Sequence, residues 1–108
     1  MITASNAEVG FPRLRAPFPY IVCYDLKGSP LGYKPFVEEL RNSVRWWHYL
    51  ENTWIVFLYE TLVELQRILA PRIYTQDRLL ILPAHGPAEG YLPKEAWEWI
   101  NEHLPRDW

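Results

Sequence analysis

Residues 45–59 read RWWHYLENTWIVFLY, and this stretch decides the fold. It divides at Glu51-Asn52, because asparagine tolerates the positive φ that a tight hairpin turn needs. Both flanking runs are rich in aromatic and β-branched residues, which fit the pleated surface of a sheet. The stretch therefore predicts an antiparallel hairpin with strands at 45–50 and 53–59.

Both faces of this hairpin carry aromatic side chains. With a two-residue loop, Leu50 lies opposite Thr53 and Trp46 lies opposite Phe57, while Trp47 points to the other face. Aromatic surface of this kind favours burial, so both faces need cover. Helices of the chain are expected to cover one face, and a partner subunit is the economical cover for the other.

The segments on either side complete the element order. The run at 20–24 is a compact strand, and the residues after it at 25–30 have turn chemistry. Residues 33–43 place apolar side chains at helical spacing, and Thr61 to Glu64 form a capping box that opens a second helix. Residues 78–82 predict a fourth strand, and Pro93 suits the first position of a last helix.

This order, β-α-β-β-α-β, predicts an α+β, ferredoxin-like fold with an extra C-terminal helix. The four strands should form one antiparallel sheet with the two internal helices on one face. The last helix is expected at an edge of the sheet or on the partner. Residues 1–18 are interpreted as an N-terminal extension and residues 19–108 as a single domain.

Composition narrows the functional classes. The chain has 108 residues, of which 16% are aromatic, and a formal net charge of −2. Constitutive binding to long duplex DNA is not favoured, because such proteins usually carry a net basic field. The apolar runs are too short to span a membrane, the N-terminus lacks a signal-peptide pattern, and a single cysteine forms no internal disulfide. A cytoplasmic protein is expected.

Several motifs resemble one family. The segments YDLK at 24–27, WHYLENTWIV at 47–56 and DRLLI at 77–81, with Tyr33 between the first two, resemble the SinR-like group of small proteins. That group is similar to the dimeric CRISPR-associated adaptation protein and to the virulence-associated VapD toxins. The resemblance covers about residues 20–104. Where the family usually has a serine, this chain has Asn52.

The resemblance implies a ferredoxin-like homodimer, and some relatives are endoribonucleases with or without a metal requirement. Asp25 matches an aspartate that closes the first strand of the CRISPR relatives and faces its symmetry mate. It is therefore a candidate catalytic residue and metal ligand, for Mg or Mn shared at the dimer axis. The alternative is a turn residue that satisfies local amides, with no cofactor.

Two histidines are candidates for proton transfer. His48, in the hairpin, could act on a ribose 2′-hydroxyl or a leaving oxygen, and exposed His85 could supply a second acid or base. The alternative for His48 is a packed, hydrogen-bonded strand residue. Phosphate contacts are expected from four basic side chains, although each of them alone could be an ordinary surface cation. One aromatic ring could stack on a base, or it could lie in the core. These residues are Lys27, Arg45, Arg78, Lys94 and Trp47.

Two functions follow, and the sequence leaves both open. The first is a small dimeric phosphodiesterase or ribonuclease acting on RNA or on short, including cyclic, oligonucleotides in antiviral defence or a toxin–antitoxin system. The second is a noncatalytic dimer that binds a nucleotide or serves as an interaction subunit. A fold alone does not choose between them.

Overall fold

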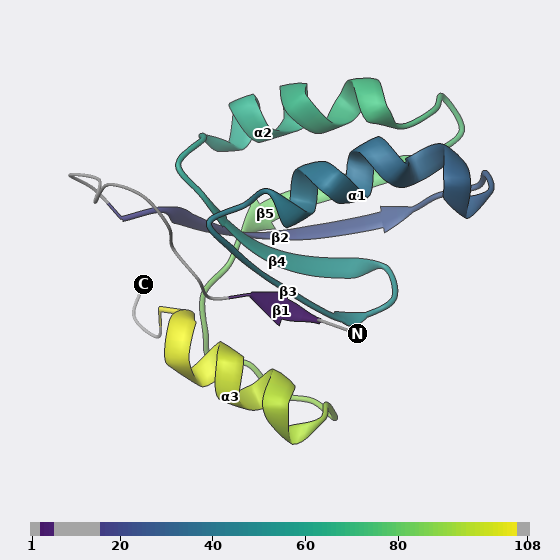
Figure 1. Cartoon of the computed structure of the whole chain (residues 1–108). Coiled ribbons are helices and arrows are strands. Elements are labelled where there is room, and N and C mark those ends of the chain that lie inside the picture. The colour runs from purple at the N-terminus through teal and green to yellow at the C-terminus, as the bar shows by residue number, and fades with distance from the viewer. Residues whose placement is uncertain (1–2, 6–15, 106–108) are drawn as a thin grey trace.

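The computed structural model of this chain describes residues 3–5 and 16–105. The elements, drawn in Figure 1, run in the order β1 (Ala4–Ser5), β2 (Phe18–Asp25), α1 (Lys34–Arg41), β3 (Arg45–Leu50), β4 (Thr53–Leu58), α2 (Leu62–Leu69), β5 (Arg78–Pro83) and α3 (Lys94–His103). Short 3-10 helices stand before α1 at Pro30–Tyr33 and after α2 at Ala70–Arg72. The predicted α+β class is confirmed. Within the described ranges, no helix has the length and apolar composition needed to cross a bilayer.

The strands form one antiparallel sheet in the order β1-β3-β4-β2-β5. Strand β2 lies inside the sheet, paired with β4 on one side and with β5 on the other. Because successive side chains alternate between faces, Tyr20 and Val22 point to one face, and Ile21 points to the other. The two faces hold separate cores, one with Tyr20 and Val22 and one packed against Ile21.

Helices α1 and α2 cover the first face side by side (Figure 1). Their inner residues are at most 3% exposed, and they are Phe36, Leu40, Leu65 and Leu69. The predicted capping box opens α2: Glu64 N donates to Thr61 Oγ1 at 3.2 Å, and Thr61 N donates to Glu64 Oε1 at 2.8 Å. A cap of this kind stabilises a helix by about 1 kcal/mol.

Helix α3 lies on the second face, on the side opposite α1 and α2, and covers part of it (Figure 1). It packs over β3 and β4, where Trp47 is 2% exposed and its Nε1 donates to the carbonyl of Ala96 at 3.2 Å. The expectation of α3 at a sheet edge or on a partner is therefore wrong. Trp99 is the buried tryptophan of α3, and Trp97 is only partly buried.

The register of the hairpin also differs from the prediction. Trp46 pairs with Val56 and not with Phe57, although Leu50 pairs with Thr53 as expected. The ladder shifts by one residue between Trp47 and Leu50, so β3 carries a β-bulge there. A bulge re-aims the side chains beside it, and in this hairpin those side chains include His48.

The N-terminal segment adds an edge strand to the sheet. Ala4 pairs with Trp47, Ser5 pairs with Trp46, and His48 N donates to the carbonyl of Thr3 at 2.6 Å. Part of the predicted extension at 1–18 therefore packs on the sheet of its own chain. Residues 1–2 and 6–15 of that extension lie outside the described residues.

The contact between α3 and the sheet contains a titratable group, His103. Its side chain is 11% exposed, and its ring packs against Trp99 at 4.8 Å and Phe57 at 6.4 Å between centroids. Burial lowers the pKa of His103, and the positive charge of Arg45 lowers it further. Glu102, 3.8 Å away, opposes this effect only in part.

This pKa shift predicts acid sensitivity of the α3 contact. In the unfolded chain His103 gains a proton near pH 6.5, whereas in the folded chain its lowered pKa delays protonation. The stability of the fold is therefore full above about pH 6.5 and declines as the pH falls from there through the lowered folded pKa. Unfolding by urea, followed by tryptophan fluorescence at pH 7.5 and 5.5, should show this loss. His103→Gln should reduce it.

His85→Gln is the matched control, because His85 is exposed in the loop after β5. That variant should keep the acid-dependent loss of the wild type. Equal losses for wild type and His103→Gln would contradict the prediction.

Candidate functional site

Three of the predicted site residues meet at one end of the sheet. Asp25 is the last residue of β2 and Arg78 is the first of β5, and the two are direct partners in the ladder. Lys27 Nζ lies 2.8 Å from Asp25 Oδ2, and the two side chains are 55% and 60% exposed, respectively. This group of Asp25, Lys27 and Arg78 is called the Asp25 cluster. It holds one ion pair, between Asp25 and Lys27, beside the strand position of Arg78, whose Nη1 donates to the carbonyls of Gln76 and Asp77.

A buried carboxylate, Asp77, is hydrogen-bonded to the backbone of this cluster on its interior side. Asp77 is 7% exposed, and its Oδ1 accepts from Lys27 N at 2.8 Å and from the Tyr33 hydroxyl at 2.9 Å. Its Oδ2 accepts from Tyr74 N at 2.8 Å. Desolvation acts to raise the pKa of Asp77, but the hydrogen bonds from Lys27 N, Tyr74 N and Tyr33 outweigh it, so the pKa is lowered.

Asp77 and Tyr33 were not predicted as site residues. Both fall within the motifs of the family resemblance, and that was the available signal. Their roles depend on contacts across 44 and 50 positions of the chain, which spacing alone does not reveal. For Tyr33, desolvation and the adjacent Asp77 carboxylate raise the pKa of the hydroxyl, which therefore remains a hydrogen-bond donor at neutral pH.

His48 lies beside the β-bulge and stacks on Trp54, with 4.0 Å between ring centroids and 11° between planes. Because a carbonyl only accepts, Nε2–H of His48 donates to the carbonyl of Glu51, 3.1 Å away. Trp54 belongs to the core under α1 and α2. The pleat directs Asp25 to the opposite face, so His48 and Asp25 are not brought together within one chain.

The other predicted residues lie elsewhere. Arg45 stands at the far end of the hairpin with its guanidinium 5.0 Å from the Phe57 ring centre. His85 and Lys94 are exposed in the loop after β5 and at the start of α3. Trp47 is buried under α3, so its ring is not available at the surface.

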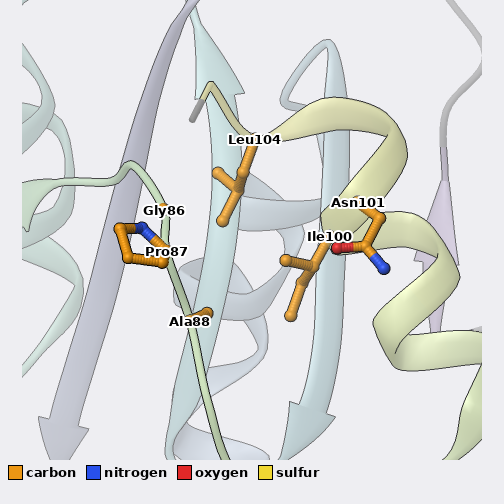
Figure 2. A pocket seen from close by; sticks show the side chains of 6 residues that line it. All are labelled: Gly86, Pro87, Ala88, Ile100, Asn101 and Leu104. Carbon is orange, nitrogen blue, oxygen red and sulfur yellow. The ribbon is translucent and has the colours of Figure 1, made fainter. Parts of the chain in front are cut away.

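A hollow of about 420 Å³ opens between the β5–α3 loop and α3, as Figure 2 shows. Its lining is Gly86, Pro87, Ala88, Ile100, Asn101 and Leu104. It follows the Pro83 end of β5, whereas the Asp25 cluster lies at the Arg78 end. Asn101 is the one polar side chain among these residues, so the hollow offers no acid–base chemistry.

An apolar stripe runs along the sheet beside the Asp25 cluster. It consists of Ile21 paired with Leu82 and Cys23 paired with Leu80, next to the pair of Asp25 and Arg78. Leu80 is 60% exposed and Leu82 is 37% exposed, because α3 covers β3 and β4 and leaves this half of the face open. The stripe and the cluster form one continuous surface.

One chain does not supply the ligand set of a metal ion at Asp25. Among residues 3–5 and 16–105, no group of three or more His, Cys, Asp or Glu side chains could hold a metal. Asp25 offers one carboxylate, which is paired with Lys27, and Mg²⁺ is usually bound through one or two carboxylates with waters completing its shell. The predicted Mg or Mn ion, shared between two chains at the dimer axis, therefore stays a prediction.

Comparison with known proteins adds no further constraint. No protein-family model, curated protein or solved structure matches this chain.

Proposed function

We propose that this chain is a homodimeric, ferredoxin-like phosphodiesterase that binds RNA or a short oligonucleotide and cleaves it at the Asp25 cluster. One observation carries the proposal: Asp25, Lys27 and Arg78 come from two segments far apart in the chain and meet on one exposed surface. Two cations suit phosphate oxygens, and a carboxylate beside them can accept a proton.

The strand order supports the ferredoxin-like part of the proposal. From β2 to β5 the elements follow β-α-β-β-α-β, and the strands lie in the order β3-β4-β2-β5. Both crossing connections, through α1 and α2, run over one face (Figure 1). This is the arrangement expected of two interleaved β-α-β units.

The surface on β5 supports the dimer. Strand β5 ends the sheet, and none of the described residues forms a strand along its outer edge. Its sequence, RLLILP, carries no charge between its ends, although exposed edge strands are usually protected by charge. An antiparallel pair of strands is compatible with a two-fold axis, so pairing of β5 with the same strand of a second copy would cover the edge and would place the partner's side chains beside Leu80 and Leu82.

Each residue of the cluster has a distinct role in this proposal. Lys27 and Arg78 bind the phosphate, and Asp25 is the candidate general base for a ribose 2′-hydroxyl or for water. His48 keeps its predicted acid–base role only as a second candidate, since its Nε2 already donates to Glu51. No step is assigned to a metal ion. The cytoplasmic location and the defence or toxin–antitoxin context come from composition and from the family resemblance.

A noncatalytic nucleotide-binding dimer is the second candidate function. Asp25 is paired with Lys27 at 2.8 Å, and His48 is held by Trp54 and Glu51 on the other side of the sheet. A single chain therefore does not present a general acid and a general base that face each other. This separation favours binding without cleavage.

The cleavage prediction concerns Asp25. Wild type incubated with RNA and with cyclic oligonucleotides should release products, resolved by electrophoresis and mass spectrometry. Asp25→Asn should lower the rate by a factor on the order of 10² to 10⁴, the usual contribution of one general acid or base. Lys27→Met should chiefly raise KM, because it removes a phosphate contact that precedes the reaction.

A chelator and the chemistry of the product ends distinguish a metal-dependent reaction from attack by the 2′-hydroxyl. Loss of activity with EDTA would assign the reaction to a metal between two chains, and 2′,3′-cyclic phosphate ends would assign it to attack by the 2′-hydroxyl. Full activity of Asp25→Asn would contradict the proposed site. Binding without cleavage by the wild type would favour the noncatalytic dimer.

The dimer prediction concerns Leu80. Light scattering at micromolar concentration should give a mass near twice 12.9 kDa. Leu80→Asp should raise the dissociation constant of the dimer by more than about tenfold, because it places a charge in an apolar contact. Val63→Asp is the matched control, since Val63 is 55% exposed on α2, on the other face, and should leave the mass unchanged. A monomeric wild type throughout this range would refute the dimer.

A further inference from the structure

The structure assigns a positioning role to Asp77: with Tyr33, it fixes the backbone of Lys27 and Gly28 and thereby sets the spacing of the two cations in the Asp25 cluster. This inference rests on the proposed function, because it explains how that site is held in shape. It concerns the interior of the protein below the cluster and not a further group on its surface.

Asp77 is hydrogen-bonded to both basic residues of the cluster, to the backbone of Lys27 and to the side chain of Arg78. Its carboxylate accepts from the backbone N of Lys27 at 2.8 Å, and its own carbonyl accepts from Arg78 Nη1 at 3.1 Å. Lys27 in turn places Nζ 2.8 Å from Asp25. One residue therefore links the segment after β2, the start of β5 and, through Lys27, the carboxylate of Asp25.

Tyr33 completes the arrangement from the 3-10 helix before α1. Its hydroxyl donates to Asp77 Oδ1 at 2.9 Å and accepts from Gly28 N at 2.7 Å. A Cβ at Gly28 would lie 2.9 Å from this hydroxyl, closer than real Cβ contacts allow. The backbone at Gly28 and the Tyr33 hydroxyl therefore fit together only when residue 28 has no side chain.

The loop before β5 holds Asp77 itself in place. Tyr74 N donates to Asp77 Oδ2 at 2.8 Å, and the Tyr74 hydroxyl donates to the carbonyl of Gly32 at 3.2 Å. The rings of Tyr33 and Tyr74 also meet at 5.5 Å in an edge-to-face contact. Asp77 thus has a fixed partner on each carboxylate oxygen, as a buried charge requires.

These contacts explain a geometry that the exposed residues could not hold alone. An exposed ion pair such as Asp25 with Lys27 contributes little stability and is easily screened by salt. Long side chains at the surface also lose conformational entropy when they are fixed. The buried network fixes the backbone from which these side chains project, so the cations need less ordering when a phosphate binds.

Tyr33→Phe tests the inference, because it removes the hydroxyl and keeps the ring. Tyr20→Phe is the matched control, since the Tyr20 hydroxyl donates to the carbonyl of Glu60 at 2.8 Å, near the opposite end of β2. Two properties should be measured: amide hydrogen exchange at Lys27 and Gly28 by NMR, and the affinity for a hexauridylate RNA by calorimetry.

Tyr33→Phe should speed exchange at the two amides by about tenfold and weaken RNA binding by a similar factor. Tyr20→Phe should change neither the amide exchange nor the RNA affinity, even if it lowers the melting temperature as much as Tyr33→Phe does. Gly28→Ala should act like Tyr33→Phe, because its methyl group displaces the same hydroxyl.

The two measurements fail separately. Unchanged amide exchange in Tyr33→Phe and Gly28→Ala would overturn the positioning role, whether or not the wild type binds RNA. Faster exchange with unchanged RNA affinity would also overturn it, because the network would then support the fold alone. A wild type that binds no hexauridylate would count against the proposed function, and amide exchange would still decide whether Asp77 and Tyr33 fix the loop.

Discussion

The rest of the structure depends on the pairing of β2 with β4 on one side and β5 on the other. This pairing places an eight-residue strand in the interior of the sheet, where its pleat sorts side chains strictly between two faces. Tyr20 and Val22 enter the core below α1 and α2, and Ile21 faces the side of α3. The same alternation carries Asp25 to the α3 side of the sheet, where α3 does not cover it. The position of the candidate site is thus a consequence of strand register.

The sequence predicted what local chemistry decides. The capping box at Thr61 and Glu64, the position of the hairpin turn at Glu51-Asn52 and a strand at 20–24 all follow from short-range preferences. The structure extends that strand to Phe18–Asp25, and Asn52 does not adopt the positive φ expected of it. The prediction failed where a choice depended on three-dimensional packing. The bulge in β3 shifts the ladder by one residue, and the propensities of Trp47, His48 and Tyr49 do not predict it. The face chosen by α3 depends on Trp47 and Ala96, which lie 49 residues apart.

The candidate site divides in the same way. Asp25 and Arg78 were both predicted, and the register of β2 with β5 makes them neighbours. His48 was predicted to act in the same reaction as Asp25, but its ring stacks on Trp54, on the other face of the sheet. Asp77 was missed because a carboxylate in a turn resembles an ordinary surface residue in sequence. Only the three donors that converge on it reveal a buried charge.

The exposed surface that a second subunit would cover is not the predicted aromatic face of the hairpin. The aromatic residues of the hairpin suggested an uncovered face, but Trp46 and Trp54 lie below the helices and Trp47 lies below α3 of the same chain. The tryptophans of the hairpin are therefore buried in two cores. The open part of the α3 face is aliphatic and lies at the other half of the sheet, where Leu80 and Leu82 project from an edge strand. Because this surface adjoins Asp25, a partner bound there would bring a second set of charges to the site.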